Sequence, residues 1–352
     1  MTVEEELRAA FARHEPLTPP TGPLRAAIDR MVVGRRRRRR RLEAGAAALA
    51  VFGLMGVAIP QFTPDRPGGE AVLLGQPSPP PPAPAGAVNV LLLGLDGSAP
   101  LADSVLIIHI PADRGRPYLV SLPRDMEVPI PGHGTGKLNS AFLKGAGEGR
   151  PDLKDGYELT RRTVSDLTGV RVDAGAVLTY PVLRTVTDEL GGVEVCLPRG
   201  VRSTHTGRLF PAGCQRLDGA ASVDLLRQRK GLPDGSLDLD RNAQLFAAGL
   251  VRGATDEGLV TNPARLSRLL AAVGSDVTVS SADGSLLELF RVVPELRSVE
   301  PVGLSVPVGP PPGQSWRLRP DPQEAPAFLA ALRGDRLAGW AAAHPDRISR
   351  LR

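Results

Sequence analysis

The chain has 352 residues, of which 42% are hydrophobic, and contains 39 glycines, 35 prolines and 2 cysteines. This composition excludes a small disulfide-rich scaffold, a multi-pass membrane protein and a wholly disordered chain. The net charge of +5 does not indicate a nucleic-acid-binding protein, because residues 1–42 alone hold 11 arginines against five acidic residues and the rest of the chain is close to neutral.

The basic residues end in a run of seven arginines, residues 35–41, which precedes an apolar stretch at 44–62. Arginines on the N-terminal side of such a stretch are typical of a membrane helix with a cytoplasmic N-terminus. We therefore expect a cytoplasmic basic tail at 1–43 and one transmembrane helix at 44–62, with the rest of the chain outside the cytoplasm at the plasma membrane. A buried core helix or a cleaved signal peptide is the alternative, because the purely apolar part is only 16 residues long.

A proline-rich segment at 63–87 follows the apolar stretch and includes Pro79–Pro82. Such a segment prefers an extended polyproline conformation, so we expect a spacer between the membrane and an outer domain. The outer domain is expected at 88–335, and a C-terminal tail at 336–352.

The only two cysteines are Cys196 and Cys214. Cys196 lies in a strand-like run at 193–197, and Cys214 lies in an apparent glycine-containing turn. Because thiols oxidise outside the cytoplasm, we expect one structural disulfide between them. Two buried free thiols are the alternative, and a metal site would need more ligands nearby.

Three apolar runs of strand length follow one another at 88–93, 104–110 and 118–122. The links between them are too short for a crossover helix, so we expect an antiparallel meander. In that order the end of the first run, the start of the second and the end of the third share one edge of the sheet. That edge carries Asp96, Asp103, Arg124 and Asp125.

Paired carboxylates at a sheet edge are oxygen ligands suited to Mg²⁺, which keeps several waters and bridges to substrate phosphates. Arg124 beside them would bind a phosphate through two parallel hydrogen bonds. The alternative is that Asp96 and Asp103 are ordinary turn residues and that Arg124 pairs with Asp125 or another acid.

Lys137 follows a glycine-rich turn and precedes an apparent helix that begins at Asn139. The segment does not match the Walker A pattern, because Leu138 stands where Ser or Thr would follow the lysine. Two interpretations of Lys137 remain: a contact with a phosphate near the helix start, or a solvated loop lysine.

Residues 218–226 predict a helix that leads into Arg-Gln-Arg. If that segment is extended, Arg227 and Arg229 share one face, because side chains alternate along a strand. The next helix places three residues near one face, namely Asp238, Arg241 and Leu245. The alternative for this trio is a surface ion pair over a packed leucine.

The stretches VNVLLLGLD, LADSVLIIHIPADRGRPYLVSLPRDMEVPIPG, GKLNSAF, ELGGVEVCLP and LDGAASVDLLRQRKGLPDGSLDLDR occur in this order between residues 88 and 335. With the preceding tail, apolar segment and linker, they resemble the LytR-CpsA-Psr glycopolymer transferases of Gram-positive cell envelopes. The resemblance implies an α/β fold with a single mixed central sheet sandwiched by helices, preceded by one transmembrane helix.

The resemblance also implies an activity, a Mg²⁺-assisted transfer of an anionic glycopolymer from a polyprenyl-(pyro)phosphate carrier to peptidoglycan. Matching the family motifs, Asp96 and Asp103 would hold the metal, and Asp238 would orient the basic residues. The residues that would bind the pyrophosphate are Arg124, Lys137, Arg227, Arg229 and Arg241. The catalytic set would be Arg124, Arg227, Arg229 and Asp238.

The chain departs from the family pattern where Ser98, Leu101 and the pair Gln244-Leu245 stand in place of residues that usually include arginine. We expect Gln244 to lie on the phosphate-facing side of its helix, one turn beyond Arg241. A non-catalytic surface or regulatory protein that binds polyprenyl phosphate in the same pocket is therefore the alternative function.

Overall fold

The computed structural model describes residues 86–96, 100–147, 151–256, 262–273, 278–281, 300–310 and 318–352. The expected cytoplasmic tail, the transmembrane helix and residues 63–85 of the expected spacer lie outside the described residues. Within the described part, no helix is both long and apolar enough to cross a membrane.

A mixed sheet of six strands forms the centre of the domain, in the order β11-β6-β1-β2-β3-β12. The strands are β1 (Val88–Leu95), β2 (Ala102–Ile110), β3 (Tyr118–Ser121), β6 (Ala174–Thr179), β11 (Thr278–Ser281) and β12 (Val302–Ser305). The antiparallel order expected for the first three is observed. Strand β6 pairs in parallel with β1, and β12 pairs in parallel with β3. The prediction of one mixed central sheet is therefore confirmed.

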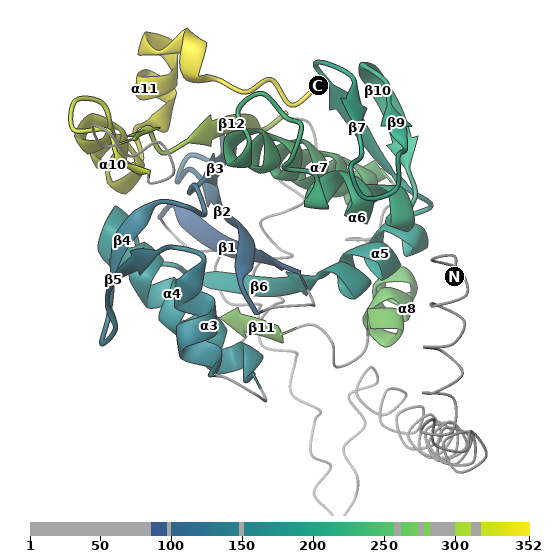
Figure 1. Ribbon diagram of the computed structural model, residues 1–352, viewed down its shortest axis with the longest axis horizontal. Helices are drawn as coiled ribbons and strands as arrows, with labels where there is room; N and C mark the ends of the chain where they lie inside the picture. The colour runs from purple at the N-terminus through teal and green to yellow at the C-terminus, as the bar shows by residue number, and fades with distance from the viewer. Residues whose placement is uncertain are drawn as a thin grey trace, which may run out of the picture. The chain divides into compact units, whose positions relative to one another are not determined.

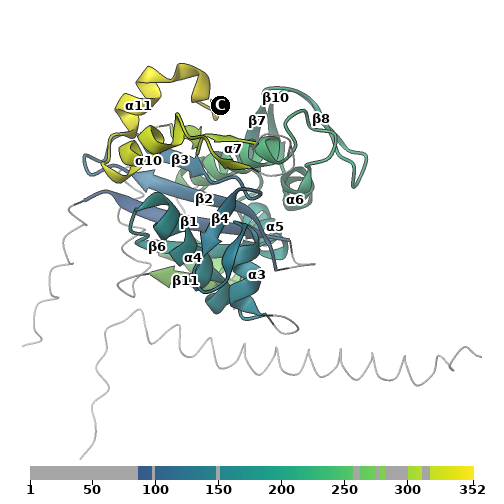
Figure 2. The ribbon, with the colours of Figure 1, turned by 60° about the vertical axis from the view of Figure 1, so that its left-hand side comes forward.

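Helices cover both faces of this sheet (Figure 1). Successive side chains of a strand point to opposite faces, so Leu91 and Leu93 join one hydrophobic cluster while Leu92 packs against the other. The first cluster includes residues of α3 (Ser140–Ala146), α4 (Leu153–Thr168), α10 (Ala325–Arg333) and α11 (Leu337–Ala343). The second includes residues of α5 (Tyr180–Glu189), α6 (Gly219–Arg227) and α7 (Ser236–Asp256). Figure 2 shows β2 between α7 and α3–α4.

Smaller elements surround these layers. Helix α8 (Pro263–Val273) lies beside α5. The two-stranded pairs are β4 (Glu127–Ile130) with β5 (Gly134–Lys137), β7 (Val193–Leu197) with β10 (Gly213–Leu217), β8 (Val201–Arg202) with β9 (Leu209–Phe210), and β13 (Val308–Gly309) with β14 (Arg319–Pro320). The glycine-rich segment before Lys137 is thus the turn and second strand of a hairpin, with positive φ at Gly132 and Gly134.

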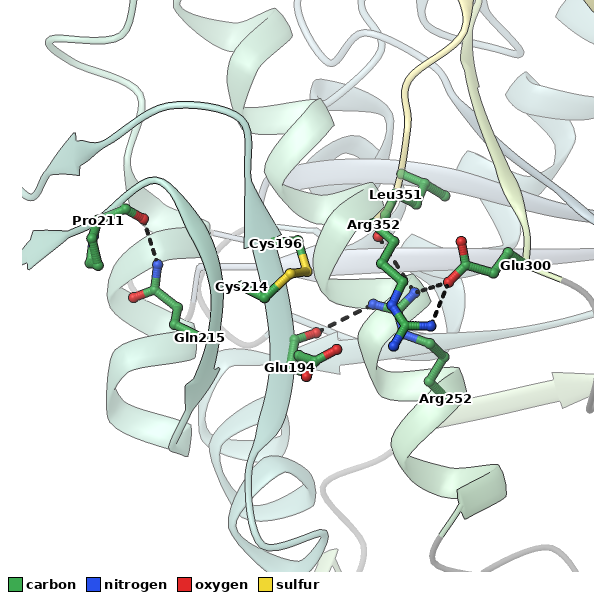
Figure 3. The surroundings of a disulfide bond; sticks show 9 residues. All are labelled: Glu194, Cys196, Pro211, Cys214, Gln215, Arg252, Glu300, Leu351 and Arg352. Carbon is green, nitrogen blue, oxygen red and sulfur yellow. Dashed lines mark hydrogen bonds and ion pairs between the residues drawn. A yellow bond between two sulfur atoms is a disulfide. The ribbon is translucent and has the colours of Figure 1, made fainter.

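The disulfide between Cys196 and Cys214 is present and joins β7 to β10 (Figure 3). The two cysteines are direct partners in the antiparallel register. The expectation that Cys214 lies in a turn is wrong, because Cys214 is the second residue of β10. The residue before it, Gly213, begins β10 with a φ of 96°, a conformation that glycine adopts readily.

The last residues of the chain pack onto the domain. Segment 336–352, treated above as a tail, contains α11 and the short 3₁₀ helix η4 (Pro345–Arg347). Trp340 and Leu351 are buried in the two clusters, and the Trp340 ring meets Phe328 edge-on at 4.8 Å. Near the end, Arg352 and Arg252 both pair with Glu300 (Figure 3).

Candidate functional site

One edge of the central sheet gathers residues from four strands. Asp96 follows β1, Asp103 is the second residue of β2, Arg124 follows β3, and Tyr180 follows β6. The β1–β2 register shifts between Gly94 and Leu95, so the pairing is irregular where the two carboxylates stand. The antiparallel and parallel pairings together therefore bring these four residues to the same edge.

Arg124 and Asp103 form an ion pair through the guanidinium Nη1 and the carboxylate Oδ1. The Arg124 side chain is only 7% exposed, and its Nε has no hydrogen-bond partner among the described residues. Burial lowers the pKa of Arg124, while the charge of Asp125 raises it. A buried guanidinium with a donor to spare is suited to an anionic ligand.

Tyr180 holds the other oxygen of Asp103, since its hydroxyl donates to Oδ2 at 3.2 Å. Burial, with the charge of Asp96, raises the pKa of Tyr180 to about 12, so the phenol stays protonated and remains a donor. Sequence analysis missed Tyr180. The available signal was its place directly after β6, because a strand parallel to β1 ends at the same edge.

Arg227 lies beside both Asp96 and the ring of Tyr180. Its Nη2 is 3.8 Å from Asp96 Oδ2, and its guanidinium carbon is 5.7 Å from the centre of the Tyr180 ring. Helix α6 ends at Arg227, and the buried Gln228 accepts a hydrogen bond from Thr204 N at 2.8 Å. This anchor leaves the arginines on either side of Gln228 exposed.

Arg229 and Lys137 complete the positive charge around Arg124. The charge of Arg229 acts on both Arg124 and Tyr180 and lowers the pKa of each. Lys137 Nζ lies 2.9 Å from Asp125 Oδ1, and its side chain is 43% exposed. The structure thus brings Lys137 beside the site through an ion pair with the residue that follows Arg124.

Asp238 and Arg241 belong to a second cluster at the start of α7. Arg241 Nη1 lies 2.7 Å from Asp238 Oδ1 and 2.7 Å from Asp234 Oδ2, and Arg199 Nη2 lies 2.6 Å from the same Asp238 oxygen. Burial by itself would raise the pKa of Asp238, but hydrogen bonds from Asp234 N and Arg241, with Arg199, hold it below its usual value. Asp238 therefore orients two arginines, and sequence analysis had named only one of them.

Asp240 connects the two clusters electrostatically. Its carboxyl is buried, and neither oxygen has a hydrogen-bond partner among the described residues. Burial raises its pKa well above the usual value, whereas the charges of Arg124 and Arg241 act in the opposite direction. Sequence analysis passed over Asp240, because an aspartate in a polar helix start carries no signal of burial.

The side-chain amide of Gln244 points at the central sheet, so the expectation that it lies on the same side of the helix as a phosphate ligand is wrong. Gln244 is 1% exposed. Its Nε2 donates to Leu119 O at 3.2 Å, to Ser121 Oγ at 2.9 Å and to Leu304 O at 2.6 Å. The helix turns Gln244 toward β3 and β12, where an arginine would place a charge among packed strands.

Asp96 and Asp103 were expected to hold a metal. Among the described residues no group of three or more His, Cys, Asp and Glu side chains forms a metal site. Two carboxylates on one sheet edge, without His or Cys, nevertheless match the donor set of Mg²⁺, which takes one or two protein carboxylates and completes its shell with water and substrate phosphate. The residues present therefore fit Mg²⁺ better than a transition metal.

The amino-acid sequence of this chain is similar to those of known proteins. The model of the LytR_cpsA_psr family matches residues 74–308. The cell wall biosynthesis protein LcpA of Corynebacterium glutamicum is 35% identical over 193 residues, which are 50% of this chain and 37% of LcpA. The polyisoprenyl-teichoic acid–peptidoglycan teichoic acid transferase TagU of Oceanobacillus iheyensis is 28% identical over 198 residues, 54% of this chain and 58% of TagU. The chain thus spans between about a third and three fifths of the length of these relatives.

The fold is also that of a solved structure, TagT bound to LI-WTA. The two superpose with a TM-score of 0.56 and 21% sequence identity, over 71% of this chain and 90% of the TagT chain. At that identity the likeness concerns the arrangement of the sheet and helices.

Proposed function

The chain belongs to the LytR_cpsA_psr family, and on this premise we propose that it transfers an anionic glycopolymer from a polyprenyl-(pyro)phosphate carrier to peptidoglycan. The observation that carries the proposal is the buried Arg124, paired with Asp103 and surrounded by further cations at one sheet edge. TagU is named as a transferase of teichoic acid to peptidoglycan, which supports the same reaction class.

Binding of a diphosphate follows from the charges at this edge. Arg124 offers an unpartnered Nε, and Arg227 is 41% exposed beside Asp96. Hydrogen bonds from guanidinium groups to phosphate oxygens are charge-assisted and are stronger inside a protein than in water. Arg229 and Lys137 add charge at the exposed side, where they attract an anionic polymer.

The transfer itself is a displacement at phosphorus. An acceptor hydroxyl forms a new bond to the phosphorus that carries the polymer, and the bond from that phosphorus to the polyprenyl phosphate breaks. Arg124 and Arg227 stabilise the charge that develops on the phosphate oxygens. Tyr180 keeps Asp103 in place during this step through its hydrogen bond.

We propose that Asp96 and Asp103 hold Mg²⁺ when the donor is bound. Mg²⁺ supplies charge neutralisation at phosphate oxygens, which makes the phosphorus a better target for a hydroxyl. The two carboxylates would hold the ion, and Arg124, which pairs with Asp103, would lie beside it to bind the phosphate.

We propose that the domain is located at the outer face of the plasma membrane. The seven arginines before residues 44–62 support a single span with the N-terminus in the cytoplasm. The disulfide between Cys196 and Cys214 supports an oxidising compartment for the domain. No nucleic acid takes part in this proposal.

The test uses the full chain in detergent or in membrane vesicles with a lipid-linked glycopolymer donor. Arg124→Ala should lose donor binding and polyprenyl phosphate release, because losing a buried charge-assisted contact costs about 2 to 5 kcal/mol. Arg162→Ala, at an exposed arginine of α4, is the matched control. Donor binding by the wild type without any release of polyprenyl phosphate would instead establish the non-catalytic binding protein.

A further inference from the structure

A pocket of about 380 Å³ lies along α7 and is lined by Arg241 but by none of the other residues expected to bind the pyrophosphate. On its helical side it is lined by residues that recur every three or four positions, namely Leu237, Asp240, Arg241, Gln244 and Leu245. This spacing defines one face of a helix. The opposite wall is formed by residues 305–308 after β12 and by residues 346–350 near the C-terminus.

The pocket opens at the same sheet edge as the phosphate cluster. Ser305 pairs with Ser121 at the ends of β12 and β3, and Val306 N donates to Ser121 O at 3.0 Å. The chain that leaves β3 carries Arg124 and the chain that leaves β12 forms the pocket wall. Because neighbouring strands are about 4.8 Å apart, the pocket is adjacent to Arg124 and not a separate site elsewhere on the domain.

Asp240 stands at the boundary between the pocket and Arg124. It lines the pocket, its carboxyl is buried, and both oxygens lack a hydrogen-bond partner within the described part of the chain. A buried carboxylate without a hydrogen-bond partner lowers the stability of the folded state, so its presence at this position needs an explanation. A carboxylate accepts hydrogen bonds, so the missing group is a donor such as a hydroxyl.

The other lining residues indicate what kind of molecule would bring that hydroxyl. Leu245, Val306 and Val308 supply apolar surface, and Ser305 and Arg241 supply hydrogen-bond donors. Asp346, Arg347 and Arg350 also line the pocket, and two of its three arginines are already paired with acids, Arg241 with Asp238 and Arg347 with Glu324. A mixture of apolar surface, donors and carboxylates suits a neutral, hydroxyl-rich ligand.

We propose that this pocket binds the carbohydrate acceptor and that Asp240 receives the hydrogen bond of its reactive hydroxyl. The inference rests on the proposed function and assigns the acceptor side of that reaction. In the transfer the acceptor oxygen bonds to phosphorus, the bond to the polyprenyl phosphate breaks, and the hydroxyl proton moves to Asp240. Burial raises the pKa of Asp240, which makes its carboxylate a stronger proton acceptor than that of an exposed aspartate.

The first experiment measures binding of a soluble peptidoglycan oligosaccharide to the full chain. Leu237→Trp fills the pocket from a half-buried position of α7, and Leu143→Trp makes the same change at a half-buried position of α3. We expect Leu237→Trp to weaken oligosaccharide binding at least about tenfold and Leu143→Trp to leave it unchanged. Equal binding by the two variants, or no binding by the wild type, would overturn the assignment of the pocket.

The second experiment replaces Asp240 by asparagine, which has the same shape but takes up no proton. Asp240→Asn should reduce transfer about 100-fold or more, in the range typical of a lost general base, with donor affinity within twofold of the wild type. It should also raise the melting temperature, because a buried unpartnered carboxyl is removed. If Asp240 had only a structural role, Asp240→Asn would instead lower the melting temperature.

The pH profile gives the third readout. The groups whose charges act on Asp240 or line the pocket beside it are Arg124, Asp125, Arg241, Asp346, Arg347 and Arg350. Wild-type transfer should rise with pH as Asp240 loses its proton, and this limb should be absent in Asp240→Asn but present in Asp166→Asn, an exposed aspartate of α4. An unchanged pH profile and transfer rate in Asp240→Asn would refute the role of Asp240 as proton acceptor.

The proposed function fails separately, if the wild type does not bind the donor. In that case the binding of the oligosaccharide would still show whether the pocket is a carbohydrate site.

Discussion

Tyr180 and Asp103 are 77 residues apart in the chain and are joined by a hydrogen bond of 3.2 Å from the phenol to carboxylate Oδ2. Asp103 is at the same time the ion-pair partner of Arg124. One tyrosine therefore connects the helix after β6 to the acid and the base at the centre of the candidate site. This connection fixes the position of the Asp103 carboxylate beside Arg124.

Tyr180→Phe should separate this hydrogen bond from the packing of the ring. A hydrogen bond to a charged group contributes about 1.5 to 3 kcal/mol, so we expect about tenfold slower transfer and a loss of stability near the lower value. Tyr157→Phe is the control, since Tyr157 is buried and its hydroxyl has no partner among the described residues. Transfer by Tyr180→Phe at the wild-type rate would mean that Arg124 alone positions Asp103.

Replacing both acids, Asp96→Asn with Asp103→Asn, tests the metal without relying on activity. A ligand that binds only the folded state raises the melting temperature, and the rise is larger for tighter binding. We expect MgCl₂ with inorganic pyrophosphate to stabilise the wild type and not the double variant. The exposed pair Asp166→Asn with Asp256→Asn serves as control. A full Mg²⁺ response in the double variant would place the metal elsewhere.

Cys196→Ser with Cys214→Ser should lower stability without changing donor binding. The bridge closes a loop with a sequence separation of 18, for which the loss is about 3 kcal/mol. Urea denaturation of the wild type with and without reductant should reproduce the difference. Free thiols in exported protein would contradict the bridge.

Gln244→Arg should destabilise the domain and not improve phosphate binding. Gln244 is buried between α7 and the strands β3 and β12, so the new guanidinium would be an unpaired buried charge costing about 3 to 5 kcal/mol. Gln323→Arg, at an exposed turn position, controls for added charge. Chemical denaturation gives the comparison, and a Gln244→Arg protein as stable as the control would contradict the structure.

The stability gained in Asp240→Asn should depend on pH. Because burial raises the pKa of Asp240 in the folded state, the folded protein holds this proton more tightly than the unfolded chain. Binding of this proton contributes fully to the stability of the folded state below the pKa of the unfolded chain, about 3.9. The contribution is lost as the pH rises through the pKa of the folded state. Asp240→Asn should therefore gain more over the wild type at pH 8 than at pH 5 in thermal melts, with Asp166→Asn as control. A gain independent of pH would contradict it.

The sequence by itself determined the meander of β1 to β3 and the edge at which Asp103 meets Arg124. Apolar runs of strand length report burial, and links too short for a helix leave only antiparallel pairing. The disulfide was also accessible, because the chain offers one cysteine pair. The start of the strand that contains Cys214 was placed too late. Glycine and proline indicate that a turn is near, but they do not fix the residue at which the next strand begins.

Only the tertiary structure decided the contacts that depend on distant segments. Tyr180 reaches Asp103 because β6 pairs in parallel with β1 and so ends at the same edge of the sheet. Asp240 directly precedes Arg241 and Gln244 follows it by three residues on the same helix. Gln244 nevertheless binds backbone carbonyls of the sheet, whereas the Asp240 carboxyl has no hydrogen-bond partner within the described residues. Helical periodicity places side chains around an axis, but the rotation of that axis against the sheet is set by packing of the whole domain.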